Sequence, residues 1–352
     1  MKLSAIPSAA VCVLFLVVLN ASCVESRTSG MFHWYTLFVF GDSFADSGNL
    51  PKDKPSDATR TWYSPYGSSD SLHYGRATGR FSNGLVESDF IGKFLGRFEA
   101  PPTYVKRPKN YVEMAGMNLA FGGAGVFEVP HKVPTLGKQV GYFKKLIKDG
   151  ILNPRMLRES VALVAISGND YARLANMNGT TEMIEFVGNV TTEIAKQVKI
   201  LQSLKVTKIL VNTMHPLGCT PWLARPQNYT ACDARGNMGA SLHNNNLKKK
   251  LGGKKNKNVM LVDLNAAFNS FVNPTDSVTD QFEHKLEPCC ESSDPNGYCG
   301  QVDENGDEAY SVCDDPDSYF YWDDVHPTQA GWKAVMDKLE GPIKDFLDIS
   351  HN

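Results

Sequence analysis

The chain has 352 residues, of which 42% are hydrophobic and 21% are charged, a composition typical of globular proteins. The formal net charge of −2 at pH 7 excludes a global basic field that would attract nucleic acid or an anionic membrane. A specific small substrate is the better expectation. No internal repeat and no linker rich in Gly, Ser or Pro divides the sequence, so we expect one domain over residues 24–352.

Residues 1–23 have the pattern of a secretory signal peptide. Lys2 supplies the positive charge, the apolar run Ala9–Leu19 follows, and small residues precede Cys23. Spanning a bilayer takes roughly 20 apolar residues, so a retained transmembrane anchor is the weaker interpretation of this run. We therefore expect removal of residues 1–23 and a secreted, extracellular protein. Three N-glycosylation acceptor sites agree with secretion, namely Asn178, Asn189 and Asn228.

The number of cysteines also agrees with an oxidising, extracellular compartment. The sequence holds eight, and loss of residues 1–23 removes Cys12 and Cys23. The even set that remains favours disulfides, whose pairing the sequence does not determine: Cys219, Cys232, Cys289, Cys290, Cys299 and Cys313. Metal binding is the alternative, but no Cys-x-x-Cys pair or closely spaced His pair accompanies these cysteines.

Short apolar runs alternate with helix-like segments, which is the rhythm of an α/β fold. The expected strands are Tyr35–Phe40, Val161–Ile166, Val206–Val211 and Val259–Val262. Apolar residues at helical spacing predict a core-facing helix over Thr191–Leu204, and a further helix is expected over Gln329–Leu347. Residues 274–319 lack clear periodicity and hold four of the cysteines, so we expect a long excursion held by disulfides.

Two of these strands end in polar residues, and open α/β sheets bind ligands beyond the carboxyl ends of their strands. Gly41-Asp42-Ser43 stands where the first strand would turn into a helix. Such a turn exposes a side chain and directs backbone N–H groups to one point. Ser43 is therefore a candidate nucleophile, although a serine at this position can also be an ordinary helix N-cap.

A catalytic serine needs a base to accept its proton and a third group to orient that base. Asp323 and His326 lie three positions apart, so a tight turn can bring the carboxylate to one ring nitrogen while the other faces Ser43. Alone, this pair is more often a surface turn. His215 and His243 have no comparable carboxylate nearby in the sequence, and we expect them to be loop or surface residues.

Acyl transfer also needs hydrogen-bond donors aimed at the developing negative oxygen. Asn169 follows the expected strand Val161–Ile166 and can donate from its side chain. The glycines of residues 118–125 let the backbone approach closely and present an N–H. A phosphate-binding loop is the alternative, but this segment lacks both the G-x-G-x-x-G spacing and a following Gly-Lys-Ser/Thr.

Two other segments have competing interpretations. Asp303, Asn305 and Asp307 resemble the start of a calcium loop, but Glu308 stands where that loop needs glycine. We therefore expect a polar loop there. The basic run over residues 248–257 falls between an expected helix and an expected strand, so we interpret it as a solvated connection.

Taken together, the chain resembles the plant branch of the GDSL lipase/esterase family, the SGNH hydrolases, over nearly all of its length after residue 23. The blocks that carry the resemblance occur in the family's order and at its separations: Phe38–Ser43 with Asp46–Asn49, Gly79–Gly84, Asn118–Gly125, Gly168–Tyr171, Pro216–Cys219 and Trp322–Thr328. The family's third block usually reads Gly-x-Asn-Asp, and here Ser167 stands in place of that glycine. We expect the added hydroxymethyl group to tighten the strand end or crowd the acyl pocket.

The resemblance implies a flavodoxin-like, three-layer α/β/α fold with a central, mostly parallel sheet. It implies ester hydrolysis or acyl transfer with Ser43 as nucleophile, His326 as general base and acid, and Asp323 orienting His326. No cofactor or metal is expected. The apoplast or cell wall is the expected location.

The same resemblance implies an oxyanion hole. Its donors would be the Ser43 N–H, a glycine N–H and the Asn169 side chain. We choose Gly123 as the glycine, with Gly122 as the second choice, because the motif does not determine which N–H points inward.

Three functions remain in competition. Carboxylic ester hydrolysis through an acyl-enzyme on Ser43 is the leading one, with an ester of a small molecule, carbohydrate or lipid as substrate. An acyltransferase would use the same triad with an alcohol in place of water. A non-catalytic glycoprotein partner on an esterase scaffold is the third, and the presence of every triad member argues against it.

Overall fold

The computed structural model describes residues 35–129, 132–176, 179–253, 256–273 and 281–349, all of which lie in one compact unit. The expected signal peptide over residues 1–23 and the acceptor site Asn178 lie outside the described residues. Among the helices that are described, none is both long enough and apolar enough to cross a membrane.

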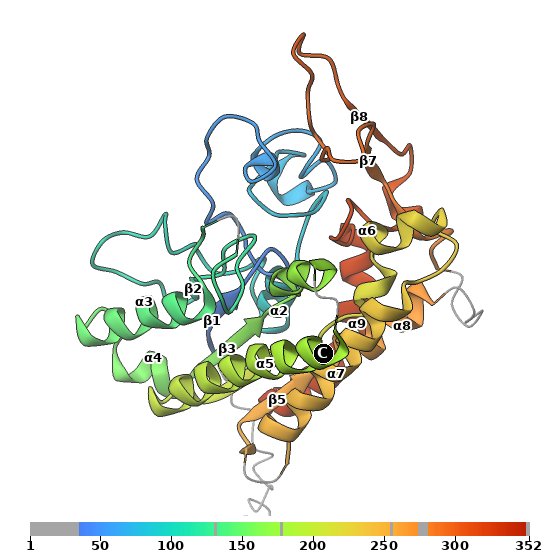
Figure 1. Cartoon of the computed structure of the whole chain (residues 1–352). Coiled ribbons are helices and arrows are strands. Elements are labelled where there is room, and N and C mark those ends of the chain that lie inside the picture. The colour runs from blue at the N-terminus through green and yellow to red at the C-terminus, as the bar shows by residue number, and fades with distance from the viewer. Residues whose placement is uncertain (1–34, 130–131, 177–178, 254–255, 274–280, 350–352) are drawn as a thin grey trace, which may run out of the picture. The chain divides into compact units, whose positions relative to one another are not determined.

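A five-stranded parallel sheet forms the centre of the fold, with the order β2-β1-β3-β4-β5 (Figure 1). The strands are β1 Thr36–Gly41, β2 Gly116–Asn118, β3 Ser160–Ala165, β4 Lys208–Asn212 and β5 Val259–Val262. The prediction for β5 is confirmed, and the predicted β1 and β3 differ from the observed strands by one residue at each end. The sequence does not predict β2, because three residues carry too little pattern.

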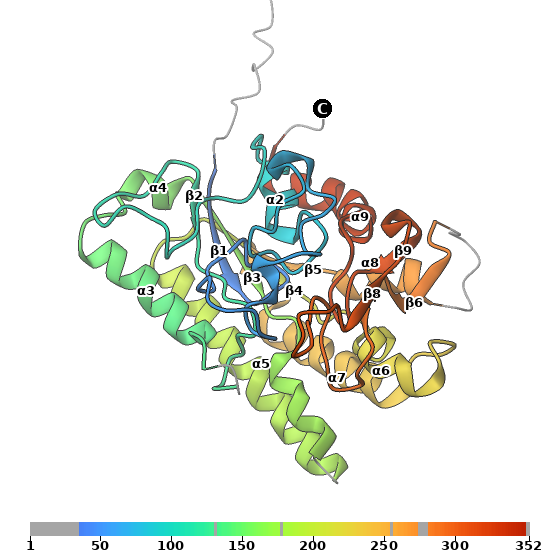
Figure 2. The same cartoon turned by 90° about the horizontal axis from the view of Figure 1, so that it is seen from above.

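Helices cover both faces of the sheet, as Figure 2 shows from above. Leu37 and Val39 of β1 pack in one hydrophobic cluster with helices on one face, whereas Phe38 and Phe40 pack in another with helices on the opposite face. Strands buried on both faces read as continuous apolar runs, which is why β1 and β3 are visible in the sequence. The predicted three-layer α/β/α architecture is therefore confirmed.

The helix bounds extend the sequence predictions. The α-helices are α2 Glu87–Phe94, α3 Leu136–Lys148, α4 Pro154–Arg158, α5 Thr180–Ser203, α6 Pro221–Ala224, α7 Ala234–Leu251, α8 Leu264–Val272 and α9 Gln329–Leu347. Helix α9 agrees with its prediction, and its first turn is capped by Thr328, whose side chain accepts from Gly331 N at 2.9 Å. Helix α5 begins eleven positions earlier than predicted, at Thr180 rather than Thr191.

The segment after α8 adds two small sheets outside the central one. Strand β6 (His284–Pro288) pairs in parallel with β9 (Tyr319–Tyr321), and β7 (Cys290–Ser292) pairs antiparallel with β8 (Tyr310–Val312). The predicted polar loop is present, because the Asp303 carboxylate accepts from the backbone N–H groups of Asn305 and Asp307. Of the excursion predicted over residues 274–319, the part from residue 281 is described.

Three disulfides join all six cysteines that follow residue 23. The pairs are Cys219–Cys232, Cys289–Cys313 and Cys290–Cys299. Disulfide formation is therefore confirmed, and the alternative of a metal site built from these cysteines is wrong, because a sulfur in a disulfide is not an available thiolate ligand. Two of the pairs close the segment that carries β7 and β8.

A buried carboxyl lies where α2 meets the sheet. Glu87 is fully buried in the first turn of α2, and its carboxyl accepts from Asn212 Nδ2 of β4 at 2.8 Å. Burial raises the pKa of Glu87 to about 8; the hydrogen bond from Asn212 opposes this shift and the charge of Asp42 adds to it. The carboxyl is therefore favoured in its neutral form within the fold.

This carboxyl predicts a pH dependence of stability. The pKa of Glu87 is higher in the fold than its ordinary 4.5, so the folded protein binds this proton more tightly than the unfolded chain. The resulting contribution to stability is complete below pH 4.5 and is lost as the pH rises toward about 8. Glu87→Gln should remove this decline and be more stable than wild type at about pH 8. Urea unfolding from about pH 5 to about pH 9 measures both effects.

The matched control is Glu182→Gln, on the exposed first turn of α5, which should leave the pH dependence unchanged. An unfolding free energy that declines equally with pH in wild type and in Glu87→Gln would contradict the assignment.

Candidate active site

The structure brings Ser43, His326 and Asp323 together at the carboxyl edge of the sheet. Ser43 follows β1, whereas Asp323 and His326 lie in the turn between β9 and α9. His326 Nε2 is 2.8 Å from Ser43 Oγ, and His326 Nδ1 is 2.7 Å and 2.9 Å from the two oxygens of Asp323. Because an ionised carboxylate can only accept, Nδ1 carries the proton and Nε2 is left to accept from the serine hydroxyl.

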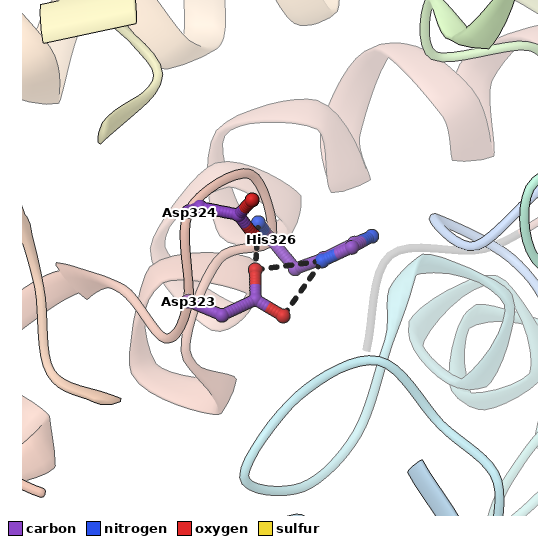
Figure 3. A group of neighbouring side chains, drawn as sticks. All are labelled: Asp323, Asp324 and His326. Carbon is purple, nitrogen blue, oxygen red and sulfur yellow. Dashed lines mark hydrogen bonds and ion pairs between the residues drawn. The ribbon is translucent and has the colours of Figure 1, made fainter. Parts of the chain in front are cut away.

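A tight turn holds the acid beside the imidazole, as the spacing predicts. Asp323 Oδ1 accepts from the backbone N–H groups of Val325 and His326 at 3.0 Å and 2.8 Å, and Trp322 N donates to the His326 carbonyl at 2.7 Å. Figure 3 shows both Asp323 oxygens facing the ring, with no hydrogen bond drawn from Asp324 to it. The Asp323 carboxylate thus accepts hydrogen bonds from the backbone of the turn and from the imidazole.

The charge of Asp323 is stabilised despite its burial. Burial disfavours the ionised form, but the interaction with His326 and the nearby Arg60 guanidinium outweigh it and hold the pKa of Asp323 well below its usual range. An ionised Asp323 can orient the imidazole and stabilise an imidazolium.

Asp323, Asp324 and His326 also place one potential ligand atom each within 4.8 Å of one another. A cation there would have to replace the hydrogen bonds that Asp323 already accepts from the turn and from His326. Asp323 and His326 are therefore engaged with each other, and we assign no metal to this group.

The possible oxyanion donors lie beside Ser43. The Gly122 N–H is already engaged, because it donates to Asp46 Oδ2 at 2.8 Å. Gly123 lines the same cavity as Ser43, and within the described residues neither the Ser43 N–H nor the Gly123 N–H has a hydrogen-bond partner. Asn169 Nδ2 donates to the Ala124 carbonyl at 2.9 Å and makes a longer contact of 3.3 Å with Asp42.

Two buried aspartates that the sequence analysis did not assign as functional hold these donors in place. Asp42 Oδ2 accepts from Ser167 N at 2.6 Å, and Asp46 Oδ1 accepts from Gly48 N and Asn49 N at 2.8 Å and 2.7 Å. Burial raises the pKa of both carboxyls to about 6, and their backbone hydrogen bonds oppose this shift. Their position inside a dense polar block of the sequence is the signal that could have identified them.

A cavity of about 560 Å³ lies over these residues, within the size range of small-molecule sites. Ser43, His326 and Asn169 line it together with apolar side chains that include Leu217, Trp222 and Leu223. Ser167 also lines it, and its carbonyl accepts a hydrogen bond from His215 Nε2 at 3.0 Å.

His215 lies in the loop after β4, as expected, but it is 1% exposed. The expectation is wrong for His243, which lies in α7 and is fully buried. Burial lowers the pKa of His215 to about 4 and that of His243 to about 3. His243 Nδ1 is 2.5 Å from the Tyr171 hydroxyl. Both rings are neutral, hydrogen-bonded core groups rather than candidate bases.

Two further residues near Asp323 have no sequence signal. Arg60 and Tyr66 lie more than 250 positions before Asp323 in the chain, yet the Tyr66 hydroxyl contacts its carboxylate at 2.8 Å. No local pattern links residues so far apart.

Of the predicted glycosylation sites that are described, both are exposed. Asn228 lies in a loop with a left-handed backbone, after the short helix Arg225–Gln227. Asn189 lies within α5, although acceptor sites are typically found in surface loops.

Comparison with known proteins identifies the family. The model of the GDSL-like lipase/acylhydrolase family matches residues 37–339. Two GDSL esterase/lipases of Arabidopsis thaliana are each 36% identical to this chain, over 320 and 323 residues; these alignments cover 88% of this chain and 88% and 87% of the relatives.

Similar solved structures are more distant. A catalytic mutant of Axe2, an acetylxylan esterase from Geobacillus stearothermophilus, matches with 14% identity and a TM-score of 0.40 over 90% of this chain and 97% of the other. A putative GDSL-like lipase from Parabacteroides merdae matches with 13% identity and a TM-score of 0.41 over the same shares. On the family match and the Arabidopsis relatives, the chain belongs to the GDSL-like lipase/acylhydrolase family of carboxylic ester hydrolases.

Proposed function

We propose that this protein is a secreted serine esterase that forms an acyl-enzyme on Ser43. The observation that carries the proposal is the continuous hydrogen-bond path from Ser43 Oγ through His326 to Asp323, at the wall of a substrate-sized cavity. A serine becomes an effective nucleophile when an adjacent, oriented base accepts its proton.

In the first step, Ser43 Oγ attacks the ester carbonyl while His326 Nε2 accepts the hydroxyl proton. Asp323 holds the ring and stabilises the imidazolium that forms. The imidazolium then returns the proton to the leaving alcohol, and the acyl group stays on Ser43. In the second step, His326 takes a proton from water as the water oxygen attacks the acyl carbonyl. The bond between the acyl carbon and Ser43 Oγ then breaks, the imidazolium returns the proton to Ser43 Oγ, and the acid is released.

The negative oxygen of each tetrahedral intermediate needs donors that are already in place. The N–H groups of Ser43 and Gly123 and the Asn169 amide are the proposed donors. The engagement of the Gly122 N–H by Asp46 supports Gly123 over Gly122. The Ala124 carbonyl and Asp42 would hold the Asn169 amide near its working position.

Secretion is supported by the signal-peptide pattern, by the exposed acceptor sites Asn189 and Asn228, and by three disulfides. Disulfides form and persist in oxidising compartments. We propose an extracellular location, with the apoplast or cell wall suggested by the plant relatives. The substrate would be an ester whose acyl or alcohol part fits the apolar side of the cavity at Leu217, Trp222 and Leu223.

Replacing the nucleophile tests the reaction. We expect the purified protein, without residues 1–23, to hydrolyse short p-nitrophenyl acyl esters, and we expect Ser43→Ala to lose this activity while its thermal unfolding changes little. Mass spectrometry should find a serine-directed phosphonate on Ser43 in the wild type only. Ser203→Ala, at the end of α5 and remote from the cavity, is the control.

Wild-type protein with neither ester turnover nor phosphonate labelling would overturn the proposal and favour a non-catalytic role. A product that carries the acyl group on an added alcohol, in preference to free acid, would identify an acyltransferase instead.

The oxyanion donors predict a different kinetic signature. Asn169→Ala should lower kcat by about 10²-fold to 10³-fold, because the lost donor acts mainly on the transition state. The KM should change little. Asn169→Asp is the matched variant, since it keeps the shape of the side chain but removes both N–H donors, and it should be at least as slow. Steady-state kinetics that show a raised KM with unchanged kcat would assign Asn169 to substrate binding.

A further inference from the structure

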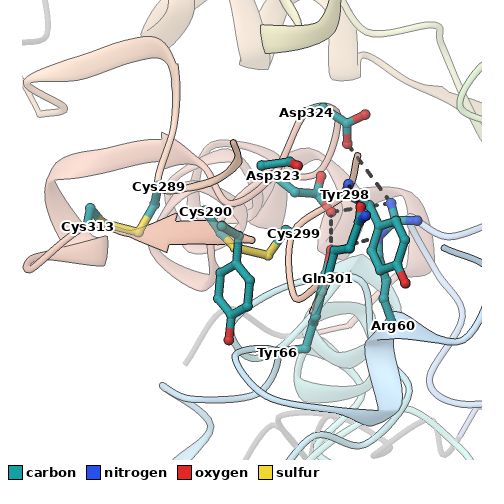
Figure 4. Close-up of a disulfide and its surroundings, with 12 residues drawn as sticks. Arg60, Tyr66, Cys289, Cys290, Tyr298, Cys299, Gln301, Cys313, Asp323 and Asp324 are labelled. Carbon is teal, nitrogen blue, oxygen red and sulfur yellow. Dashed lines mark hydrogen bonds and ion pairs between the residues drawn. A yellow bond between two sulfur atoms is a disulfide. The ribbon is translucent and has the colours of Figure 1, made fainter. Parts of the chain in front are cut away.

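One oxygen of the Asp323 carboxylate contacts two side chains from a distant part of the chain. The Tyr66 hydroxyl donates to Asp323 Oδ2 at 2.8 Å, and Arg60 Nε donates to the Tyr66 oxygen at 2.8 Å. Arg60 Nη2 itself lies 3.6 Å from Asp323 Oδ2. Figure 4 shows Arg60 and Tyr66 beside Asp323, next to the Cys290–Cys299 disulfide.

Arg60, Tyr66, Asp323 and His326 form a series of hydrogen bonds. Arg60, at its start, determines the direction of each bond. A guanidinium has only donors, so the Tyr66 oxygen accepts from Arg60 and its single proton is directed to Asp323. The carboxylate accepts from Tyr66 and from His326 Nδ1, which leaves Nε2 unprotonated and able to accept from Ser43. The series therefore favours the one neutral imidazole tautomer that can take the serine proton.

Burial of Arg60 and Tyr66 keeps these hydrogen bonds in the same direction. Tyr66 is 1% exposed and the Arg60 side chain is 10% exposed, and the guanidinium lies 5.3 Å from the centre of the Phe81 ring. Burial raises the pKa of Tyr66 well above its ordinary value; the charge of Arg60 opposes this shift and that of Asp323 adds to it. Tyr66 therefore keeps its proton and remains a donor.

The disulfide-closed segment fixes the position of Tyr66. The Tyr66 ring packs in a buried cluster with Trp322 and the cysteines of two disulfides, and its centre is 6.0 Å from that of the Trp322 ring. Cys290 N donates to the Trp322 carbonyl at 2.7 Å. The loop that carries Tyr66 and the turn that carries Asp323 are thus attached to the same support.

We propose that Arg60 and Tyr66 are positioning residues that hold the Asp323 carboxylate, and through it His326, in the orientation that accepts the Ser43 proton. This inference rests on the serine esterase mechanism proposed above. Among the described residues, Arg60 lines the cavity and Tyr66 does not, so Tyr66→Phe separates positioning from direct substrate contact. A positioning role should affect the chemical step rather than substrate affinity.

Kinetics of Tyr66→Phe, Arg60→Met and the double variant test the inference. Each single change should lower kcat by about 10-fold to 100-fold, the effect expected for losing a hydrogen bond to a charged group, and the KM should stay within about twofold. Because Arg60 acts partly through Tyr66, the double variant should lose less than the product of the two single effects.

Tyr63→Phe is the matched control. It removes a tyrosine hydroxyl from the same loop, where the group donates to the Asp53 carbonyl and not to Asp323, so kcat should be unchanged. Titration with a serine-directed phosphonate counts the competent sites in each preparation, and kcat is expressed per labelled site. A variant that is partly unfolded therefore gives fewer labelled sites but not a lower kcat per site.

Wild-type kcat per labelled site in both single variants would overturn the positioning role. A change confined to the KM, or single effects that multiply in the double variant, would also overturn it. Failure of the esterase mechanism is a separate result, because in that case the wild type itself neither turns over an ester nor accepts the label.

Discussion

The pairing of β1 with β3 at the centre of the parallel sheet is the constraint on which the site depends. The pairing runs from Thr36 opposite Ser160 to Gly41 opposite Ala165, so both strands end at the same edge. Gly41 is required there, because a Cβ atom would lie 2.0 Å from the Ala165 carbonyl oxygen and its φ is +145°. The residues that follow, Ser43 and Asn169, consequently reach one cavity from two strand ends.

Buried carboxylates organise the loops that leave this edge. Asp42, Asp46 and Asp323 each accept several hydrogen bonds, mostly from backbone N–H groups, and so replace the water that burial removes. Burial raises the pKa of Asp42 and Asp46 to about 6. Asp323 differs because its interactions with His326 and with the nearby Arg60 outweigh burial and hold its pKa below its usual range. Asp46 also has a nearby cation, Arg80, so the direct hydrogen bond with His326 distinguishes Asp323 from the two carboxyls that bind backbone N–H groups.

The added small sheets support the acid–imidazole turn rather than the central sheet. Strand β9 leads directly into Trp322 and Asp323 and pairs in parallel with β6. Cys289 N donates to the Tyr321 carbonyl of β9, and Cys290 N donates to the carbonyl of Trp322. The disulfides fix this segment next to the loop that carries Tyr66. A turn whose atoms must stay within hydrogen-bond distance of Ser43 gains from such a rigid support.

Local pattern alone was sufficient to predict β5, helix α9 and the turn between Asp323 and His326, because each depends on residues close in the chain. It also predicted an α/β fold, since strands buried on both faces leave continuous apolar runs, whereas the three-layer α/β/α architecture was an expectation from the family resemblance. Only the tertiary structure decided the cysteine pairing, the burial of His215 and His243, and the contact of Arg60 and Tyr66 with Asp323. These features depend on contacts between residues far apart in the sequence, and only the packed chain determines which of them meet.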